Sequence, residues 1–508
     1  MELEFSSSSI LLGSLLFLFL VLSIRKRSKN NGRSINLPPG PPKLPIIGNL
    51  HQLGGSLPHY QLRDLAKKYG PLMHLQLGEL STVVVSSVEF AEEVMKIHDA
   101  TFASRPYNPA ANFLSYNSTD IIFSPYGDYW RQLRKICTLE LLSKKRVQSF
   151  RSIREEEVST LINWIASRAG SPVNLTNGVY TFTCGVTSRA AFGKKCEDQE
   201  LFLSAVKEIG EVLGGFNVAD MFPSINVLQW MSGIWSRVEK LHQVTDRILE
   251  NIINEHKEGK ARSEIGKSRE DDHEDLVDVL LKFQEDGDVK LTTDNIKAVI
   301  WDIFSAGIDT SATTIDWAMS ELMNNPRVMK KAQAEVRQDF NCKGNVNEIG
   351  INEMKYLKVV IKETLRLHPP GPLLSPRECR EGCKFKGFDI PIKTKVLVNA
   401  WAIGRDPKYW SEPDSFIPER FLDSPIDYKG THFEYLPFGA GRRMCPGVSF
   451  GLANVELVLA MLLYHFDWKL PNEMKHGDLN MTEIFGITVK RKDDLCLVPI
   501  PYHPSTAA

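Results

Sequence analysis

A twenty-residue segment without a charged side chain, from Phe5 to Ile24, constrains the organisation of this chain more than any other feature. At about 1.5 Å per residue, a helix of that length spans the ~30 Å hydrocarbon core of a bilayer. Arg25, Lys26 and Arg27 follow at once, whereas two glutamates are the only charged side chains before the segment. Because basic residues stay on the cytosolic side, the pattern predicts a lumenal N-terminus and a cytosolic body.

A cleaved signal peptide is the rival interpretation of this segment. It fits poorly, because the basic cluster stands on the wrong side and no A-x-A-like cleavage site follows. No later run of eighteen apolar, uncharged residues occurs, so the sequence predicts a single membrane span. We therefore divide the chain into an anchor at 1–24, a basic stop-transfer and proline-rich hinge at 25–49, and one body at 50–508.

The hinge contains four prolines in the five positions after Leu37. Such a run forms neither a helix nor a central strand, so its backbone is extended and stiff. It is either a rigid spacer that orients the body against the bilayer or a ligand for a polyproline-binding domain. Its position directly after an anchor favours the spacer.

The charge balance and the cysteines exclude several classes of protein. The 61 Lys+Arg residues balance 62 Asp+Glu residues, so the basic stripe typical of nucleic-acid binding is not expected. Eight cysteines without a CxxC pair indicate neither a zinc framework nor a secreted disulfide scaffold. In the cytosol they should be reduced thiols, and Cys379 and Cys383 are not expected to form a bridge.

Helical periodicity dominates the body. Asp294–Met323 and Met354–Leu367 predict long helices, the second with an apolar stripe at helical spacing. The charged, glycine-containing stretch His256–Asp275 predicts a solvated loop between helices. Short extended runs predict small sheets, at Thr82–Val85, Lys395–Val398 and Leu495–Val498. The expected fold class is therefore α+β, mainly α with small β-sheets.

The segment from Leu436 to Gly447 is the most informative one for chemistry. Its glycines allow a tight backbone loop, and Pro446 favours the first turn of a helix that the apolar run Val448–Leu463 continues. Cys445 would then lie at a helix N-terminus beside two arginines, where the helix dipole and the cations both favour the thiolate. Such a thiolate suits nucleophilic catalysis or metal ligation.

The pattern Phe438-x-x-Gly441-x-Arg443-x-Cys445-x-Gly447 resembles, without a mismatch, the haem-binding signature of the cytochromes P-450, and of the plant microsomal members in particular. The resemblance implies the cytochrome P-450 fold around haem b, with Cys445 as the axial ligand of the iron. It also implies that Phe438 packs near the thiolate and that Arg443 contacts a haem propionate. A thiolate ligand pushes electron density toward bound dioxygen and favours O–O cleavage, so the residue type suits the chemistry.

Two further motifs resemble haem-contacting segments of this family. Trp130 and Arg134 are spaced i,i+4 and share one face of a predicted helix. Alone, that spacing is typical of an amphipathic surface helix. The resemblance implies that both side chains reach a haem propionate, and that Arg377 in Ser375-Pro-Arg does so from a strand.

Ala306 and Gly307 lie in the middle of the predicted helix Asp294–Met323. Glycine costs about 1 kcal/mol there relative to alanine, a cost that close packing of helices could compensate. The resemblance implies instead that the small residues leave a groove for dioxygen. It also implies that the acid–alcohol pair Asp309 and Thr310 is catalytic and relays protons.

Glu363 and Arg366 form an i,i+3 pair that carries little weight alone, since such a pair is worth about 0.2–0.5 kcal/mol on an exposed helix. With Arg420 in Pro418-Glu-Arg-Phe they resemble the Glu–Arg–Arg triad of the family. The resemblance implies a structural role for the three residues, which support the region of the haem loop.

The resemblance also implies NADPH-dependent monooxygenation by a haem-thiolate catalytic domain over 50–508. No dinucleotide fingerprint or flavin-binding module occurs in the sequence, so electrons must come from a partner, the NADPH–cytochrome P-450 reductase of the endoplasmic reticulum membrane. Five basic residues are candidate docking cations, although a solvated basic face explains them equally well. They are Arg131, Lys135, Lys144, Lys145 and Arg146.

The segments that contact substrate in the family are largely apolar in this chain, which favours a lipophilic substrate, although core packing also supplies apolar residues. The candidate pocket residues are Phe113, Ile121, Phe216, Trp301, Phe304, Leu373, Leu374 and Phe485. The sequence resembles plant enzymes that oxidise sesquiterpenes and diterpenes, which predicts a terpenoid substrate. Alkaloids and phenolics are the alternatives.

Two hypotheses from other classes compete with a monooxygenase. One is a reductase-independent haem-thiolate isomerase or dehydratase, and the other is a non-enzymatic haem sensor or electron carrier. The intact pair Asp309 and Thr310 argues against both, because neither needs a proton relay. The predicted cytosolic topology also argues against the isomerase.

Overall fold

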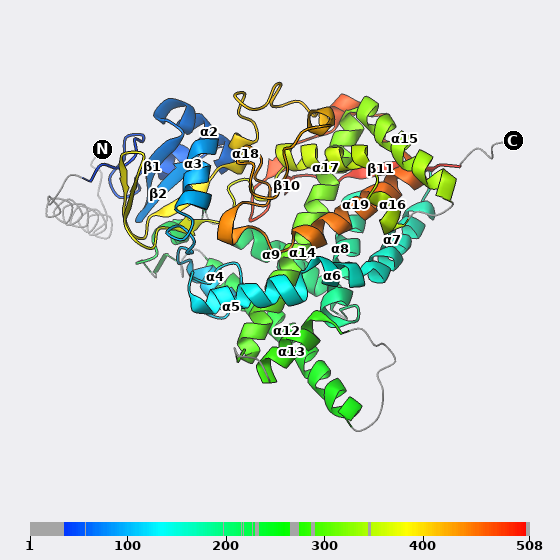
Figure 1. The fold of residues 1–508 in the computed structure, drawn as a ribbon, viewed down its shortest axis with the longest axis horizontal. Helices are drawn as coiled ribbons and strands as arrows, with labels where there is room; N and C mark the ends of the chain where they lie inside the picture. Colours follow the sequence, from blue (N-terminus) through cyan, green and yellow to red (C-terminus); the bar gives the residue numbers. More distant parts are fainter. Residues whose placement is uncertain are drawn as a thin grey trace, which may run out of the picture.

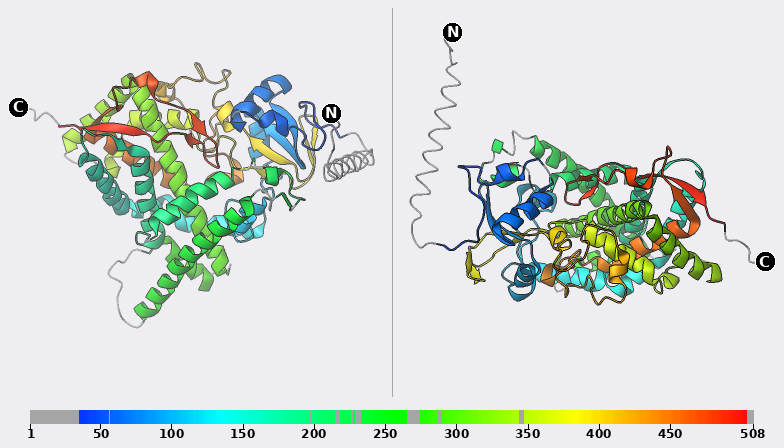
Figure 2. Two further views of the ribbon diagram at one scale, coloured as in Figure 1. Left: turned by 180° about the vertical axis from the view of Figure 1, so that it is seen from behind. Right: turned by 90° about the horizontal axis from the view of Figure 1, so that it is seen from above.

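The computed structural model describes residues 35–503 except 56, 197, 215, 217, 226, 229–232, 265–273, 286–289 and 344–346. Strands β1 (Leu72–Leu77) and β2 (Leu80–Val85) lie in a β-rich part at one end of the molecule, and helices make up most of the rest (Figure 1). Figure 2 shows the same division from behind and from above. The predicted membrane anchor at 1–24 lies outside the described residues, as does the hinge up to 34.

Helix α14 (Thr293–Asn324) runs through the helical part and positions much of the site. A capping box begins it: Thr292 Oγ1 accepts a hydrogen bond from Asn295 N at 3.2 Å, and Asn295 Oδ1 accepts one from Thr292 N at 3.0 Å. Most of its side chains are buried, so α14 is covered on nearly all sides rather than amphipathic. The helix predicted at Asp294–Met323 is confirmed.

Three helices pack most extensively against α14. They are α8 (Leu175–Phe192), α17 (Lys355–Leu367) and α19 (Val448–His465). Helix α19 is long and apolar enough to cross a membrane, but 61% of it is buried inside the protein. It also packs against α7 (Arg151–Ala166) and α15 (Pro326–Lys343). In the part of the chain that the structure describes, α19 is therefore a core helix.

The largest sheet has the strand order β1-β2-β7-β4. Strand β2 pairs in parallel with β7 (Lys395–Val398), with Val83 opposite Val396, and the other pairs are antiparallel. Most of its side chains are buried, as expected for a sheet that packs inside the protein. The short edge strand β4 (Arg377–Glu378) carries Arg377, so the sheet positions one of the predicted haem-contacting residues.

The smaller sheets are short. Strand β11 (Cys496–Pro501) pairs with β3 (Val173–Asn174) and β8 (Phe466–Lys469). Two hairpins pair β5 (Cys383–Phe385) with β6 (Phe388–Ile390), and β9 (Glu483–Ile484) with β10 (Lys490–Arg491). The fold class expected from the sequence, mainly helical with small sheets, is confirmed. The other helices are α2 (Pro58–Tyr69), α3 (Val88–Glu92), α4 (Pro109–Leu114), α5 (Asp128–Ile136), α6 (Lys144–Ser149), α9 (Gln199–Val212), α10 (Val218–Met221), α12 (Ile234–Glu264), α13 (Leu276–Glu285), α16 (Glu348–Ile351) and α18 (Ala400–Ile403).

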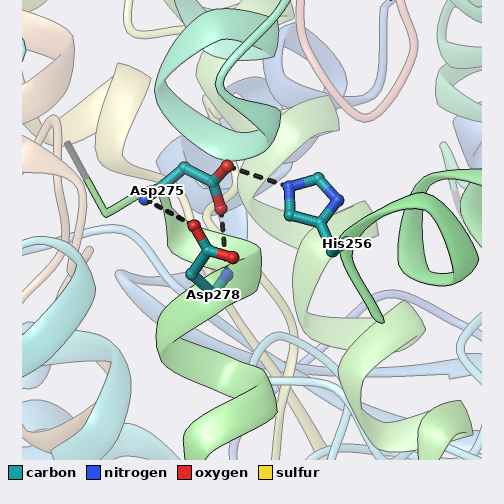
Figure 3. Close-up of side chains that lie close together, drawn as sticks. All are labelled: His256, Asp275 and Asp278. Carbon is teal, nitrogen blue, oxygen red and sulfur yellow. Dashed lines mark hydrogen bonds and ion pairs between the residues drawn. The ribbon is translucent and has the colours of Figure 1, made fainter. Parts of the chain in front are cut away.

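The loop predicted at His256–Asp275 is wrong in its first half, because α12 continues to Glu264. His256 of α12 is buried against the start of α13, and its Nε2 lies 2.9 Å from Asp275 Oδ2 (Figure 3). Its Nδ1 lies 2.7 Å from the carbonyl oxygen of Ile252. The charge pattern of the sequence did not predict this buried histidine, which links α12 to the start of α13.

Both partners of the His256 ring are hydrogen-bond acceptors, so the ring donates from both nitrogens, as only an imidazolium can. Burial alone lowers the pKa of His256, but the hydrogen bond and charge of Asp275, together with the Ile252 carbonyl, raise it above its ordinary value. Asp275 Oδ1 also accepts a hydrogen bond from Asp278 N at 2.9 Å, which caps α13.

Candidate active site

The segment that begins at Phe438 forms a tight loop ahead of α19. Gly439 and Gly441 have φ angles of 68° and 69°, in the left-handed region that favours glycine. A Cβ atom at Gly441 would stand 2.1 Å from the carbonyl oxygen of Met95, so no side chain fits there. The N–H of Cys445 donates to the carbonyl oxygen of Phe438 at 3.0 Å and closes the loop. The tight loop predicted from the glycines is therefore present.

Cys445 lines a mostly apolar cavity of about 340 Å³ and is exposed there. The loop supplies one part of the wall and α14 supplies another. The α14 residues that line it include Trp301, Asp302, Ala306, Gly307, Asp309 and Thr310. The structure thus brings together the cysteine motif and the acid–alcohol motif, which lie more than a hundred residues apart in the sequence.

The two arginines beside Cys445 do not act as the sequence predicted. Helix α19 begins only at Val448, so Cys445 precedes its first turn. Arg442 turns away to Asp99, with Nη1 3.0 Å from the carboxylate, and Arg443 donates from Nε to a backbone carbonyl at 2.7 Å. In the folded protein an arginine side chain donates to the acceptors that surround it. Its position beside Cys445 in the sequence does not determine which acceptors those are.

Burial raises the pKa of the Cys445 thiol above its ordinary value. The N–H of Gly447 and the positive charge of Arg134 oppose this effect only in part. The prediction that the protein alone favours the thiolate is therefore wrong. A metal ion coordinated by the sulfur deprotonates a thiol outright, so the thiolate would form together with iron binding.

Four guanidinium groups gather at the edge of the cavity, from Arg105, Arg134, Arg377 and Arg443. Arg377 has one carboxylate partner, Asp99 at 3.2 Å, and the other three donate to backbone carbonyls. Burial and the neighbouring charges of Arg377 and Arg134 lower the pKa of Arg443 to about 9. Burial and the same kind of repulsion lower the pKa of Arg105. Guanidinium groups crowded with so few carboxylates suit an anionic ligand.

This donor set fits haem b. A thiol for the iron stands in the cavity wall, guanidinium groups for the two propionates stand at its edge, and much of the remaining wall is apolar. Phe438 is part of that wall. Arg105 was not predicted, because no local pattern distinguishes it from the other arginines of the sequence.

Trp130 of α5 packs against Arg443 and does not line the described cavity. Its indole N–H donates to the carbonyl oxygen of Ile121 at 3.0 Å, and the guanidinium of Arg443 lies 4.0 Å from its ring centroid. The indole thus supports Arg443 through a cation–π contact, with its N–H turned to the backbone. Arg134, one helical turn further on, does line the cavity.

Gly307 serves the packing of helices as well as the cavity. A Cβ atom there would stand 3.4 Å from Phe450 of α19 and 3.4 Å from Thr187 of α8, in van der Waals contact with both helices. Ala306 and Gly307 both line the cavity. Gly307 therefore lies at a helix contact and at the cavity wall, and the groove for dioxygen stays a prediction.

The acid–alcohol pair Asp309 and Thr310 lines the cavity, with Asp309 buried. Thr310 Oγ1 donates to the carbonyl oxygen of Ala306 at 2.6 Å, within its own helix. Asp309 accepts hydrogen bonds from the hydroxyls of Tyr180 and Thr488, which belong to distant parts of the chain. Neither hydroxyl was identified from the sequence, because only the fold brings them to α14.

A pair of carboxyl groups, Asp120 and Asp302, holds the segment around residues 121–122 against α14. Asp302 accepts hydrogen bonds from Ile121 N at 2.8 Å and from Ile122 N at 3.1 Å. Burial raises the pKa of Asp302 above its ordinary value and that of Asp120 to about 7. Two adjacent buried carboxyls cannot both ionise easily, so the pair holds a proton. The result is that Ile121 is fixed at the cavity wall.

The structure brings Glu363, Arg366 and Arg420 together in the core. Arg366 donates to both carboxylate oxygens of Glu363, at 2.7 and 2.8 Å, and Arg420 Nε donates to the same group at 3.0 Å. Arg366 also donates to the carbonyl oxygens of Gly404 and Pro413, at 2.7 and 2.6 Å. The triad therefore ties α17 to the long segment that leads to the cysteine loop.

Three of the predicted pocket residues, Ile121, Trp301 and Leu374, line the described cavity. Phe304 is wholly buried and stacks on an aromatic ring of α9 at 4.1 Å, while its neighbour Ile303 lines the wall. Successive side chains of a helix point about 100° apart. A correctly predicted segment therefore does not determine which of its side chains faces the cavity. The predictions that the structure places outside the wall are Phe113, Phe216, Phe304, Leu373 and Phe485.

A profile of the cytochrome P-450 family matches residues 38–497. The chain belongs to the cytochrome P-450 family. Premnaspirodiene oxygenase from Hyoscyamus muticus is 54% identical over 496 residues, which are 96% of this chain and 98% of the relative. Tabersonine 16-hydroxylase 2 from Catharanthus roseus is 54% identical and covers 96% and 97%. Desmethyl-deoxy-podophyllotoxin synthase from Sinopodophyllum hexandrum is 54% identical and covers 99% and 98%.

Solved structures agree with this assignment. A zebra fish cytochrome P-450 with abiraterone superposes with a TM-score of 0.74 over 88% of this chain and 99% of that chain, at 24% sequence identity. The fold is therefore that of the cytochromes P-450. The protein is a haem monooxygenase that receives electrons from NADPH through a reductase, as the sequence predicted.

Proposed function

We propose that this cytochrome P-450 is anchored in the endoplasmic reticulum membrane and hydroxylates a lipophilic terpenoid. One observation carries the proposal: Cys445, the arginines and the pair Asp309 and Thr310 all border a single, mostly apolar cavity. The anchor at 1–24 would place the body in the cytosol, with the N-terminus in the lumen.

Each part of the cavity has a role in this proposal. When bound, the haem activates dioxygen and transfers one oxygen atom to a carbon of the substrate. Cys445 would bind the iron, and the guanidinium groups of Arg134, Arg377 and Arg443 would hold the propionates. Asp309 and Thr310 would pass protons into the cavity, while the apolar wall excludes water and orients the substrate.

The apolar wall supports a lipophilic substrate. It includes Val206, Ile209, Leu213, Ile303 and Ile487, side chains that offer no hydrogen bonds. Relatives of similar identity act on terpenoid, alkaloid and phenolic substrates, and one is named for premnaspirodiene. A terpenoid is our proposal because it needs few polar partners, and alkaloids and phenolics are the alternatives.

The reductase would dock on the basic side chains of α5 and α6. Arg131, Lys135, Lys144 and Lys145 are exposed, whereas Arg146 is half-buried and pairs with Glu274 at 2.8 Å. Arg131 pairs with Asp128, the residue that begins α5. The three lysines are therefore the stronger candidates for attracting an acidic partner.

Product analysis tests the proposal most directly. Microsomes containing this protein and a reductase are supplied with NADPH and a panel of sesquiterpenes and diterpenes, with one alkaloid and one phenolic as comparison. We expect a hydroxylated terpene that forms only with NADPH. Product from the comparison compounds alone would overturn the substrate class, and conversion without NADPH would favour an isomerase.

Two variants test the roles of the residues. Cys445→Ala should lose the thiolate-type Soret band of the reduced carbon monoxide complex. Thr310→Ala should keep that band and consume NADPH with little product. An unchanged spectrum in the first variant, or full coupling in the second, would contradict the assigned role.

A further inference from the structure

Asp309 has both carboxylate oxygens bonded to hydroxyls from other elements. Tyr180 of α8 donates to Oδ1 at 2.6 Å, and Thr488 Oγ1 donates to Oδ2. All three side chains are buried, so these bonds replace hydration of the carboxylate. Asp309 is thus clamped between α8 on one side and the turn between β9 and β10 on the other.

The two partners come from different kinds of element, and each is held in place. Tyr180 lies in a core helix, and burial and the charge of Asp309 raise its pKa well above the ordinary value, so its hydroxyl stays a donor. Thr488 belongs to a turn that itself forms part of the cavity wall. Backbone bonds hold this turn on both sides of Thr488: Ile487 N donates to Gly210 O, and Val489 N to Pro370 O, each at 2.8 Å.

We infer that Tyr180 and Thr488 are positioning residues for Asp309, which hold its carboxylate in one orientation at the cavity wall. Ile487 and Thr488 both line the cavity, so the bond from Thr488 fixes Asp309 beside the space that a substrate would occupy. A proton-transfer group must stay within hydrogen-bond reach of the atom that it serves, and the loss of one of the two bonds would leave the carboxylate free to turn. The inference rests on the proposed role of Asp309 in proton transfer.

Thr488→Val keeps the shape of the side chain and removes its hydroxyl, whereas Thr488→Ser keeps the hydroxyl. In microsomes with reductase, using the panel terpene that yields most product, we expect product per NADPH to fall about tenfold in the valine variant. The serine variant should stay within about twofold of the wild type. The solvent deuterium isotope effect on product formation should increase only in the valine variant.

A second measurement needs no turnover. In the haem-loaded protein, hydrogen–deuterium exchange at the amides of Ile487 and Val489 should accelerate in Thr488→Val and not in Thr488→Ser. Unchanged exchange in both variants would overturn the claim that the Thr488 hydroxyl fastens the turn to α14.

Asp309→Asn separates this inference from the proposal on which it rests. If Asp309→Asn retains full product per NADPH, the proton-transfer role of Asp309 is wrong. If Asp309→Asn uncouples the enzyme but Thr488→Val and Tyr180→Phe do not, only the positioning inference is wrong. If the inference holds, adding Thr488→Val to Asp309→Asn produces no further loss, because the two residues act through one contact.

Discussion

Gly441→Ala is expected to abolish haem binding, whereas Gly439→Ala, two residues earlier in the same loop, is not. Both positions have φ near +68° to +69°, so an alanine at either pays the same backbone cost of about 1–2 kcal/mol. Their surroundings differ. A Cβ atom at Gly441 would meet Met95 O at 2.1 Å and the Asp99 carboxyl at 2.8 Å, while the nearest atom to one at Gly439 is Leu374 Cδ1 at 3.7 Å.

Only a backbone movement can relieve the clash at Gly441. The contact with the Met95 carbonyl must lengthen from 2.1 Å by roughly 1 Å to reach an ordinary carbon–oxygen separation. Overpacking of this kind costs about 1–3 kcal/mol, so Gly441→Ala should cost about 2–5 kcal/mol in total. A ligand must be held within about 0.5 Å of its productive position. The displaced loop therefore carries Cys445 too far to bind iron.

The assay is haem content per polypeptide after identical purification, together with the reduced carbon monoxide spectrum. Gly439→Ala should retain the thiolate-type Soret band at a melting temperature a few degrees below that of the wild type. Gly441→Ala should contain little haem and lack the band. Equal haem content and equal spectra in the two variants would refute the steric argument, because both share the backbone cost.

Three further predictions concern stability and haem retention. Glu363→Gln leaves the buried guanidinium of Arg366 and the half-buried one of Arg420 without their anion, so the free energy of unfolding should fall by about 3–5 kcal/mol in denaturant titrations; a loss below about 1 kcal/mol would contradict the role of the buried Glu363 carboxylate. Arg105→Gln removes one guanidinium from the cavity edge and should make haem dissociate about tenfold faster into apomyoglobin, whereas the exposed Arg380→Gln should not; equal rates would refute the role of Arg105. The raised pKa of His256 means that its stabilising contribution is complete below its ordinary value of 6.5 and is lost as pH rises through the folded value. Amide exchange in α13 should therefore accelerate as pH rises above about 6.5, after correction for intrinsic rates, and Asp275→Asn should remove this dependence; constant protection in the wild type would contradict the imidazolium.

The amino-acid sequence by itself determined the parts of this protein that depend on local chemistry. The glycines of the cysteine loop allow a tight turn, and Gly439 and Gly441 adopt left-handed φ angles there. The helix around Asp309 follows from its apolar content and cap, and the spacing of Glu363 and Arg366 brings one carboxylate to one guanidinium within a single turn. Such features need only neighbours within a few residues, so the pattern of the sequence contains them.

The tertiary structure alone decided which side chains meet across the chain. Arg105 joins the cavity edge, Thr488 reaches Asp309 across 179 positions, and Ile303 rather than Phe304 faces the cavity. The pKa of Cys445 is raised, not lowered, because desolvation depends on everything that surrounds the sulfur. Burial, side-chain direction and long-range partners are properties of the packed core. No local pattern encodes them, since each depends on residues that are near only after folding.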